Sequence, residues 1–202
     1  DGLANEAVWA KCTWYTMDQA WLFALPPASD FTGNYKVAWD QNYIYLLAEI
    51  TDDIISDDHA APLTQWYDDD CLEVFLDENR SKGTHQNNYN AFAYHVRLSY
   101  DVVDLGTDNA PHLYNDHITT MRTTVGTKTI WECRIKIFDD TFVYGRTNTL
   151  ISLATDKIMG FSLAYCDNDA GTTREGFIGS GVVPGADKNV GYKTADYFQE
   201  LQ

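Results

Sequence analysis

Trp66 and Tyr67 stand in an acidic stretch a few residues before Glu73, and these three side chains offer the chemistry of sugar recognition. Trp66 lies outside any run of alternating hydrophobicity, so a core does not require its ring. Sugar rings present C–H faces that pack on aromatic faces and leave their hydroxyls free for hydrogen bonds. A carboxylate such as Glu73 accepts those bonds in charge-assisted form. Two plainer interpretations stay open: Trp66 anchors its loop to the core, and Glu73 is solvated or pairs with Arg97.

Hydrolysis of a glycosidic bond would need two carboxylates that face each other across a cleft. Asp70 and Glu73 are three positions apart on one predicted strand, so they point to opposite faces. Glu49 could approach Glu73 from another strand, but nothing in the sequence marks it as an acid. The histidines form no HExxH motif, and no phosphate-binding loop or nucleophile–base pair is present. We therefore expect a protein that catalyses nothing.

Clustered acidic residues in several turns predict a calcium site, because hard cations collect carboxylate and carbonyl oxygens. The predicted ligands are Asp77, which begins an Asp-Glu-Asn turn, and Asp167 and Asp169, which flank Asn168. No segment has EF-hand spacing, and plain solvated turns are the alternative interpretation. Ca²⁺ in a structural role is thus the only cofactor expected, and no organic cofactor is.

The chain is strongly acidic: its 202 residues include 30 Asp and Glu against 14 Lys and Arg, a net charge of −16. This charge repels phosphate backbones and anionic lipids, and no basic stripe offers a local exception. Nucleic-acid and membrane partners are therefore not expected. The four cysteines, Cys12, Cys71, Cys133 and Cys166, have no CxxC spacing, which argues against a zinc cluster. They are either buried free thiols or include one disulfide whose pair the sequence does not select.

The elements that must position these residues are strands. Seven runs rich in β-branched and aromatic residues are bounded by Asp, Asn, Gly and Pro clusters. These runs are Tyr35–Trp39, Tyr43–Thr51, Asp70–Leu76, Ala91–Tyr100, Ile118–Val125, Thr129–Phe138 and Met159–Cys166. No apolar period of 3.6 persists long enough for a crossover helix. The sequence predicts an all-β, two-sheet antiparallel sandwich that forms a single domain over residues 1–202, with a barrel as the lesser option.

Alternation along the strands divides the side chains between a core and an outer face. In the run from Cys71, the residues Leu72, Val74 and Leu76 are predicted to face the core, whereas Glu73 shares the outer face with Cys71 and Phe75. In the run from Ala91, aromatic and aliphatic residues alternate with Ala93, His95 and Arg97. Trp9, Trp39 and Trp131 are predicted to be core residues. A mixed polar face of this kind is typical of a sheet with a shallow binding surface.

The chain resembles the family 9 carbohydrate-binding modules and their relatives with a DOMON-like β-sandwich. The resemblance runs nearly end to end and rests on the order and spacing of Asp1-Gly2, Glu6–Trp9, Val37–Leu46, Asp70–Asn79, Trp131–Ile137, Gly160–Ala164, Asp167–Asp169 and Arg174–Ser180. It implies that two aromatic rings sandwich a terminal sugar while polar side chains of one sheet bond its hydroxyls. Trp66, with Tyr67 as its rival, matches the first aromatic, and Glu73 matches the strand glutamate.

Other positions depart from that pattern. Ala93 and His95 stand where the family has an arginine and an asparagine, Ala164 replaces a glutamine, and no aromatic lies near Ser180, where the second tryptophan is expected. His95 could still donate to a hydroxyl. The expected carbohydrate-binding residues are Trp66, Tyr67, Glu73, His95, Arg97, Asn168 and Arg174.

The resemblance implies a saccharide ligand and a monomer, or one module of a larger exported bacterial protein associated with polysaccharide degradation. Its place would be extracellular, periplasmic or on the cell surface. Two rivals remain. Related DOMON-like domains bind haem b, and His95 with Met121 or Met159 could provide axial ligands. The chain could also be a purely structural spacer beside an enzyme.

Overall fold

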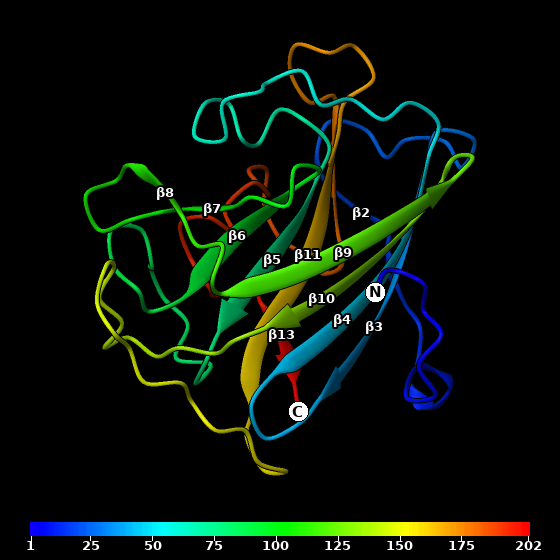
Figure 1. Ribbon diagram of the computed structural model, residues 1–202. Helices are drawn as coiled ribbons and strands as arrows, with labels where there is room; N and C mark the ends of the chain where they lie inside the picture. The colour runs from blue at the N-terminus through cyan, green and yellow to red at the C-terminus, as the bar shows by residue number, and fades with distance from the viewer.

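Two antiparallel sheets stacked face to face make up the computed structural model, which describes residues 1–202 (Figure 1). The five-stranded sheet has the order β1 (Tyr15–Met17), β3 (Phe31–Trp39), β4 (Ile44–Asp52), β10 (Lys128–Ile135) and β9 (Ile118–Val125). The eight-stranded sheet has the order β2 (Gln19–Leu22), β12 (Gly176–Gly179), β11 (Met159–Asp167), β5 (Cys71–Asp77), β6 (Phe92–Arg97), β7 (Val102–Leu105) and β8 (Pro111–Leu113), and β13 (Gln199–Leu201) also pairs with β11. The predicted sandwich is therefore confirmed.

The core between the sheets is built from the alternating side chains that the sequence pattern assigned to it. Leu72, Val74 and Leu76 of β5 face Ile44 and Trp131 of the other sheet within one buried cluster. The turn at residues 40–42 joins β3 to β4, with Trp39 paired to Ile44. The only helix is a short 3-10 turn, η1 (Trp9–Lys11). The structure contains no long apolar helix of the kind that could span a bilayer.

A second hydrophobic cluster lies on the outer face of the eight-stranded sheet. There Cys71 and Phe75 of β5 pack with Trp21 of β2 and with Ala195 and Phe198 of the chain that follows β12. This irregular segment, residues 180–198, folds back over part of the sheet and leaves the rest of the outer face for a pocket. Because most of the segment lacks regular structure, its role has no periodic signal in the sequence.

Several sequence-based expectations need correction. Trp39 is 42% exposed and not a core residue, because it is the last residue of β3 and lies where the sandwich ends. Trp9 and Trp131 are buried, as predicted. Six short strands, β1, β2, β7, β8, β12 and β13, were not predicted, since segments of three or four residues carry too little alternation to be recognised.

Candidate functional site

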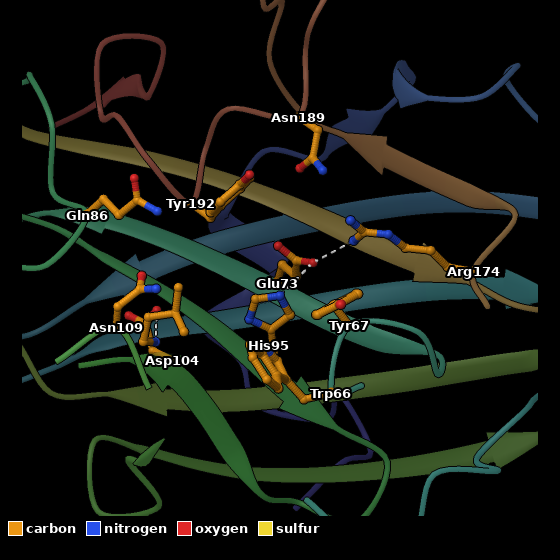
Figure 2. A pocket seen from close by; sticks show the side chains of 11 residues that line it. Trp66, Tyr67, Glu73, Gln86, His95, Asp104, Asn109, Arg174, Asn189 and Tyr192 are labelled. Atoms are coloured by element: carbon orange, nitrogen blue, oxygen red, sulfur yellow. Dashed lines mark hydrogen bonds and ion pairs between the residues drawn. The ribbon is translucent and has the colours of Figure 1, made fainter. Parts of the chain in front are cut away.

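Adjacent strands of the eight-stranded sheet form the floor of a pocket of about 470 Å³ (Figure 2). Glu73 of β5 lies directly opposite His95 of β6 on one side and Ala164 of β11 on the other. Because residues opposite one another in a sheet point to the same side, Glu73 and His95 reach the outer face together. The pocket is lined by Trp66, Tyr67, Glu73, Gln86, His95, Asp104, Leu105, Asn109, Arg174, Asn189 and Tyr192.

Glu73 is 2% exposed, and one of its carboxylate oxygens receives three protein donors. Oε1 lies 2.9 Å from His95 Nε2 and 3.2 Å from the Arg174 guanidinium, and the thiol of Cys166 donates to it at 3.0 Å. No hydrogen bond of the structure engages Oε2. Burial opposes the ionisation of Glu73, but the charges of His95 and Arg174 outweigh it and hold the pKa of Glu73 below its usual value. The floor thus presents an ionised carboxylate with one oxygen free to accept a hydrogen bond from a ligand.

The surroundings of His95 favour a proton on each of its ring nitrogens. Nδ1 lies 3.1 Å from the carbonyl oxygen of Ala93, and Nε2 donates to Glu73, so each nitrogen has an acceptor inside the protein. Burial disfavours the charged ring, but the neighbouring Glu73 carboxylate outweighs this and raises the pKa of His95 to about 9. Since neither nitrogen is free for a hydroxyl, His95 holds and orients Glu73, in contrast to the direct contact expected from the sequence.

Arg174 comes from the loop between β11 and β12 and closes one side of the floor. Its guanidinium lies over two aromatic rings, 4.4 Å from the centre of Phe177 and 5.4 Å from that of Tyr67. The same group donates to Cys166 at 3.0 Å and to Glu73. Arg174 therefore lines the pocket, and it is the partner of Glu73 in place of Arg97.

Aromatic side chains stand on separate sides of the pocket. Trp66 packs edge-on against Tyr67, with ring centres 5.2 Å apart, and edge-on against His95. Tyr192, from the segment after β12, lies on the other side of Glu73 (Figure 2). The chain has no aromatic residue near Ser180, where the family resemblance places the second ring. Tyr192 does line the pocket, but it lies in an irregular loop whose sequence has no spacing signal.

Polar groups complete the pocket, and the sequence did not point to them. Gln86, Asn109 and Asn189 offer amide donors and acceptors from three separate loops. Asp104 of β7 also lines the pocket, but its Oδ2 accepts the amide proton of Ala93 at 2.8 Å and its Oδ1 that of Leu105 at 2.7 Å. Burial raises the pKa of Asp104 to about 6. Both carboxylate oxygens of Asp104 are thus occupied by hydrogen bonds from the backbone.

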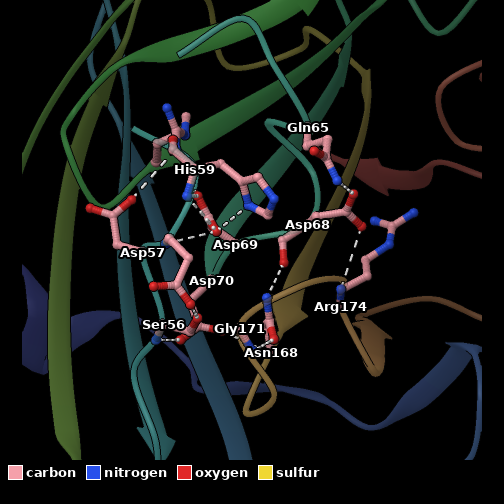
Figure 3. A network of polar contacts seen from close by, with 12 residues as sticks. Ser56, Asp57, His59, Gln65, Asp68, Asp69, Asp70, Asn168, Gly171 and Arg174 are labelled. Carbon is pink, nitrogen blue, oxygen red and sulfur yellow. Dashed lines mark hydrogen bonds and ion pairs between the residues drawn. The ribbon is translucent and has the colours of Figure 1, made fainter. Parts of the chain in front are cut away.

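Arg97 and Asn168 do not line the pocket and instead hold the loop that carries Trp66 (Figure 3). Arg97 is 1% exposed, donates to the Asp69 carboxylate at 2.8 Å and also bonds the carbonyl of His59. Asn168 is fully buried and donates to the carbonyl of Asp68. These two residues, expected from the sequence to bind sugar, therefore lie outside the pocket, because the loop before β5 folds over them.

The predicted metal ligands separate into two places. Asp77 ends β5 and accepts the backbone amides of Ser81 and Lys82, so it closes a turn. Asp167 ends β11 at the other end of the sheet, where it and Asp169 meet further carboxylates. That cluster, here called the acidic cluster, consists of Asp30, Asp52, Asp53, Asp70, Asp167 and Asp169.

The acidic cluster holds more negative charge than its own contacts can balance. One oxygen each of Asp30, Asp167 and Asp169 is buried without a hydrogen-bond partner. Burial and the nearby Asp52 raise the pKa of Asp167 to about 8 and that of Asp70 to about 9. Unpartnered oxygens and disfavoured ionisation are what a set of cation ligands shows in the absence of its ion. The donor set, all carboxylate oxygens, suits Ca²⁺.

The residues considered for other chemistry lie on separate faces. Met121 is 48% exposed on β9, Met159 is 3% exposed in the core, and His95 faces the pocket, so no two of them can ligate one haem iron. Glu49 lies on β4 in the five-stranded sheet and pairs with Lys128, so it does not approach Glu73.

Solved structures with this architecture include family 9 carbohydrate-binding modules from Caldicellulosiruptor kristjanssonii. One, in complex with glucose, matches 99% of this chain and 87% of its own with a TM-score of 0.70 and 19% identity. Another, in complex with cellotriose, matches 96% and 84% with a TM-score of 0.66 and 18% identity. At these identities the similarity shows a common fold.

Curated relatives are much longer proteins. Endo-1,4-beta-xylanase A of Thermoanaerobacterium saccharolyticum is 34% identical over 70 residues, which are 35% of this chain and 5% of that protein. Exoglucanase XynX of Acetivibrio thermocellus is 30% identical over 101 residues, 50% of this chain and 8% of that protein. The matched segments are thus a small part of these relatives. A sequence profile described as "Carbohydrate family 9 binding domain-like" matches residues 1–201, and the chain therefore belongs to this family of carbohydrate-binding domains.

Proposed function

We propose that the pocket above Glu73 is the saccharide site of this carbohydrate-binding domain, with a sugar ring against Trp66 and its hydroxyls bonded to the floor. The observation that carries the proposal is the asymmetric Glu73 carboxylate. Three protein donors hold Oε1, and Oε2 stays available at the base of a hollow with aromatic sides. A ligand hydroxyl would donate to a charged, preoriented acceptor without moving any side chain.

The size and lining of the pocket suit a short saccharide. A volume of about 470 Å³ lies within the range of roughly 300–1,000 Å³ that small-molecule sites occupy. Trp66 and Tyr192 offer ring faces or edges to sugar C–H groups, and Gln86, Asn109 and Asn189 offer amides to hydroxyls. Neutral ligands of this kind are compatible with a chain of net charge −16.

Binding without turnover follows from the state of the two carboxylates in the pocket. A glycosidase needs one carboxylic acid to protonate the leaving oxygen and a second carboxylate to act as base or nucleophile. Asp104 has both oxygens bonded to backbone amides, and Glu73 is held ionised by His95 and Arg174. Neither group is set up to donate a proton to a glycosidic oxygen.

For the ligand we propose a β-linked glucan or xylan oligosaccharide, and for the parent a larger exported bacterial protein that acts on plant polysaccharide. The complexes of the structural neighbours with glucose and cellotriose support the first part. The relatives' names, endo-1,4-beta-xylanase and exoglucanase, support both.

Isothermal titration calorimetry with glucose, cellotriose and xylo-oligosaccharides tests the proposal. Trp66→Ala should weaken binding by about 2 kcal/mol, roughly 30-fold, because the truncated ring is a central contact. Trp14→Ala is the matched control, since Trp14 is 45% exposed and lies outside the pocket. Unchanged affinity in Trp66→Ala would overturn the assignment. A folded wild-type domain that binds none of these sugars would favour the structural-spacer alternative.

We further propose that the acidic cluster binds one structural Ca²⁺. The support is the set of buried carboxylate oxygens without partners on Asp30, Asp167 and Asp169. An ion bound only by the folded state stabilises it by about 2.7 kcal/mol at a hundredfold excess over Kd, which is roughly 5–10 °C in Tm for a domain of this size.

Differential scanning fluorimetry with calcium and with a chelator tests this second proposal. Asp167→Asn should abolish the calcium-dependent rise in Tm. Asp77→Asn should keep it, although its own Tm falls, because Asp77 closes a turn at the far end of β5. If the wild-type Tm does not change when calcium is added back after exhaustive chelation, the proposed site is refuted.

A further inference from the structure

We infer that Cys71 and Cys166 are joined by a cross-strand disulfide beneath the saccharide pocket when the protein folds in an oxidising compartment. The inference rests on the proposed export of the protein, and it selects a pair that the sequence left open. Cys71 begins β5, and Cys166 lies directly opposite it on β11. Both side chains belong to the outer hydrophobic cluster, so they point to the same face.

The geometry brings the two sulfurs together. The Sγ atoms of Cys71 and Cys166 and a carboxylate oxygen of Glu73 all lie within 4.8 Å of one another. Residues directly opposite in an antiparallel pair have Cβ atoms about 4.5–5.5 Å apart, and a disulfide needs about 3.5–4.5 Å. The pair lies near the end of the β5–β11 ladder, where a small approach of the strands can close that gap.

The other cysteines are placed elsewhere. Cys133 faces the core between the sheets, where its sulfur lies 3.2 Å from the hydroxyl of Thr120. Cys12 follows η1 near the N-terminus and its thiol donates to the carbonyl of Val8. Neither lies on the outer face of the eight-stranded sheet, so each is expected to stay a free thiol.

A metal ion is a poorer explanation for the grouping of Cys71, Glu73 and Cys166. The Arg174 guanidinium donates both to Cys166 at 3.0 Å and to Glu73 at 3.2 Å. It places a fixed positive charge against two of the three candidate ligands, which opposes a cation there. A neutral disulfide has no such conflict: it removes the thiol donor of Cys166 to Glu73, and Arg174 and His95 continue to hold the carboxylate.

The reaction is thiol–disulfide exchange with a disulfide-bearing oxidant, such as a thiol oxidase or oxidised glutathione. One cysteine thiolate attacks the oxidant's S–S bond, forms a mixed disulfide and releases one thiolate of the oxidant. The second cysteine thiolate then attacks the mixed disulfide and releases the other. Two thiols become one disulfide, and the oxidant leaves as two thiols with both electrons and both protons.

The exchange belongs to the folding stage. Both sulfurs are fully buried in the finished sheet, where no oxidant reaches them. Burial and the neighbouring Cys71 raise the pKa of Cys166, which keeps the reactive thiolate scarce in the folded domain. The bond should therefore form before the outer cluster closes and then resist reductants until the domain unfolds.

The test compares one chain produced in two compartments. The protein is exported to a bacterial periplasm or retained in a reducing cytoplasm, then denatured, and its free thiols are counted with Ellman's reagent. The expected result is two thiols for the exported chain and four for the cytoplasmic chain. Non-reducing peptide mapping of the exported chain should yield one linked pair of peptides, containing Cys71 and Cys166, that dithiothreitol separates.

Four free thiols in the exported, folded chain would overturn the inference, and so would a link that involves Cys12 or Cys133. Exported Cys166→Ser should show three free thiols and no link, and a count of one free thiol in this variant, which would mean a disulfide among Cys12, Cys71 and Cys133, would also contradict the pairing. The thiol count needs no ligand, and sugar binding can be measured on both wild-type forms. A failure of the disulfide and a failure of the saccharide site are therefore distinguishable.

Discussion

Protonated His95 makes the stability of this domain depend on pH by an amount that follows from the structure. The pKa of His95 rises from an ordinary 6.5 to about 9 in the folded protein, because the Glu73 carboxylate outweighs the cost of burial. Below pH 6.5 the ring is charged in both the folded and the unfolded chain, so the stabilisation is fully present. Between pH 6.5 and 9 only the folded chain keeps the proton. The stabilisation, about 3 kcal/mol from the size of the shift, is lost across this window.

Urea unfolding at a series of pH values measures the effect, with His95→Gln as the comparison. The acidic cluster complicates the wild-type profile, because the raised pKa values of Asp70 and Asp167 also make stability fall with rising pH. Saturating calcium should hold those carboxylates ionised and remove most of that contribution if the proposed ion binds. The useful quantity is therefore the difference in unfolding free energy between wild type and variant. The remaining contribution of the acidic cluster is the same in both proteins and cancels in this difference.

We expect that difference to shrink by about 3 kcal/mol between pH 6.5 and 9. Its slope against pH should correspond to about one proton bound by the folded chain and not by the unfolded chain. A difference that stays constant over this range would refute the charged state of His95, and with it the account of how Glu73 is held. A direct titration of the imidazole by NMR gives an independent reading of the same pKa.

Three further outcomes are expected. Tyr192→Ala should reduce sugar affinity about tenfold in calorimetry with little change in Tm, and an unchanged affinity would remove Tyr192 from the site. Glu73→Gln should weaken binding by about 1.5–3 kcal/mol, roughly 10- to 160-fold, since a neutral amide replaces a charged acceptor; equal affinity would mean that Oε2 does not meet the ligand. Arg97→Met should lower the unfolding free energy by about 3–5 kcal/mol, because Asp69 loses its buried partner, and urea denaturation that shows less than 1 kcal/mol would contradict this.

Much of the scaffold could be read from the sequence because long strands alternate. The parity of residues along β5 placed Leu72 in the core and Glu73 outside, and the structure agrees. The same alternation along β6 put His95 on the outer face of the sheet, beside Glu73. Trp39 shows the limit of the method, since parity gives the direction of a side chain but not where the opposing sheet ends.

The walls of the site could not be read in this way, because they come from irregular chain. Tyr192 reaches the pocket only because residues 180–198 fold back over the sheet. Arg97 and Arg174 illustrate the same point. Arg97 was the partner considered for Glu73, but the loop before β5 covers Arg97 with Asp69, whereas the turn after β11 delivers Arg174 to the floor. Such choices depend on contacts between segments far apart in the chain.

The division between a strand-built floor and loop-built walls has a consequence for ligand preference. Glu73 and His95 sit in register on a paired ladder, so changes there disturb the scaffold, but Trp66 and Tyr192 sit on two loops that can vary independently. Loop exchange or a short insertion beside either ring could thus retune selectivity among oligosaccharides while the anchoring carboxylate stays in place. Directed evolution of new glycan probes would best begin at these two loops.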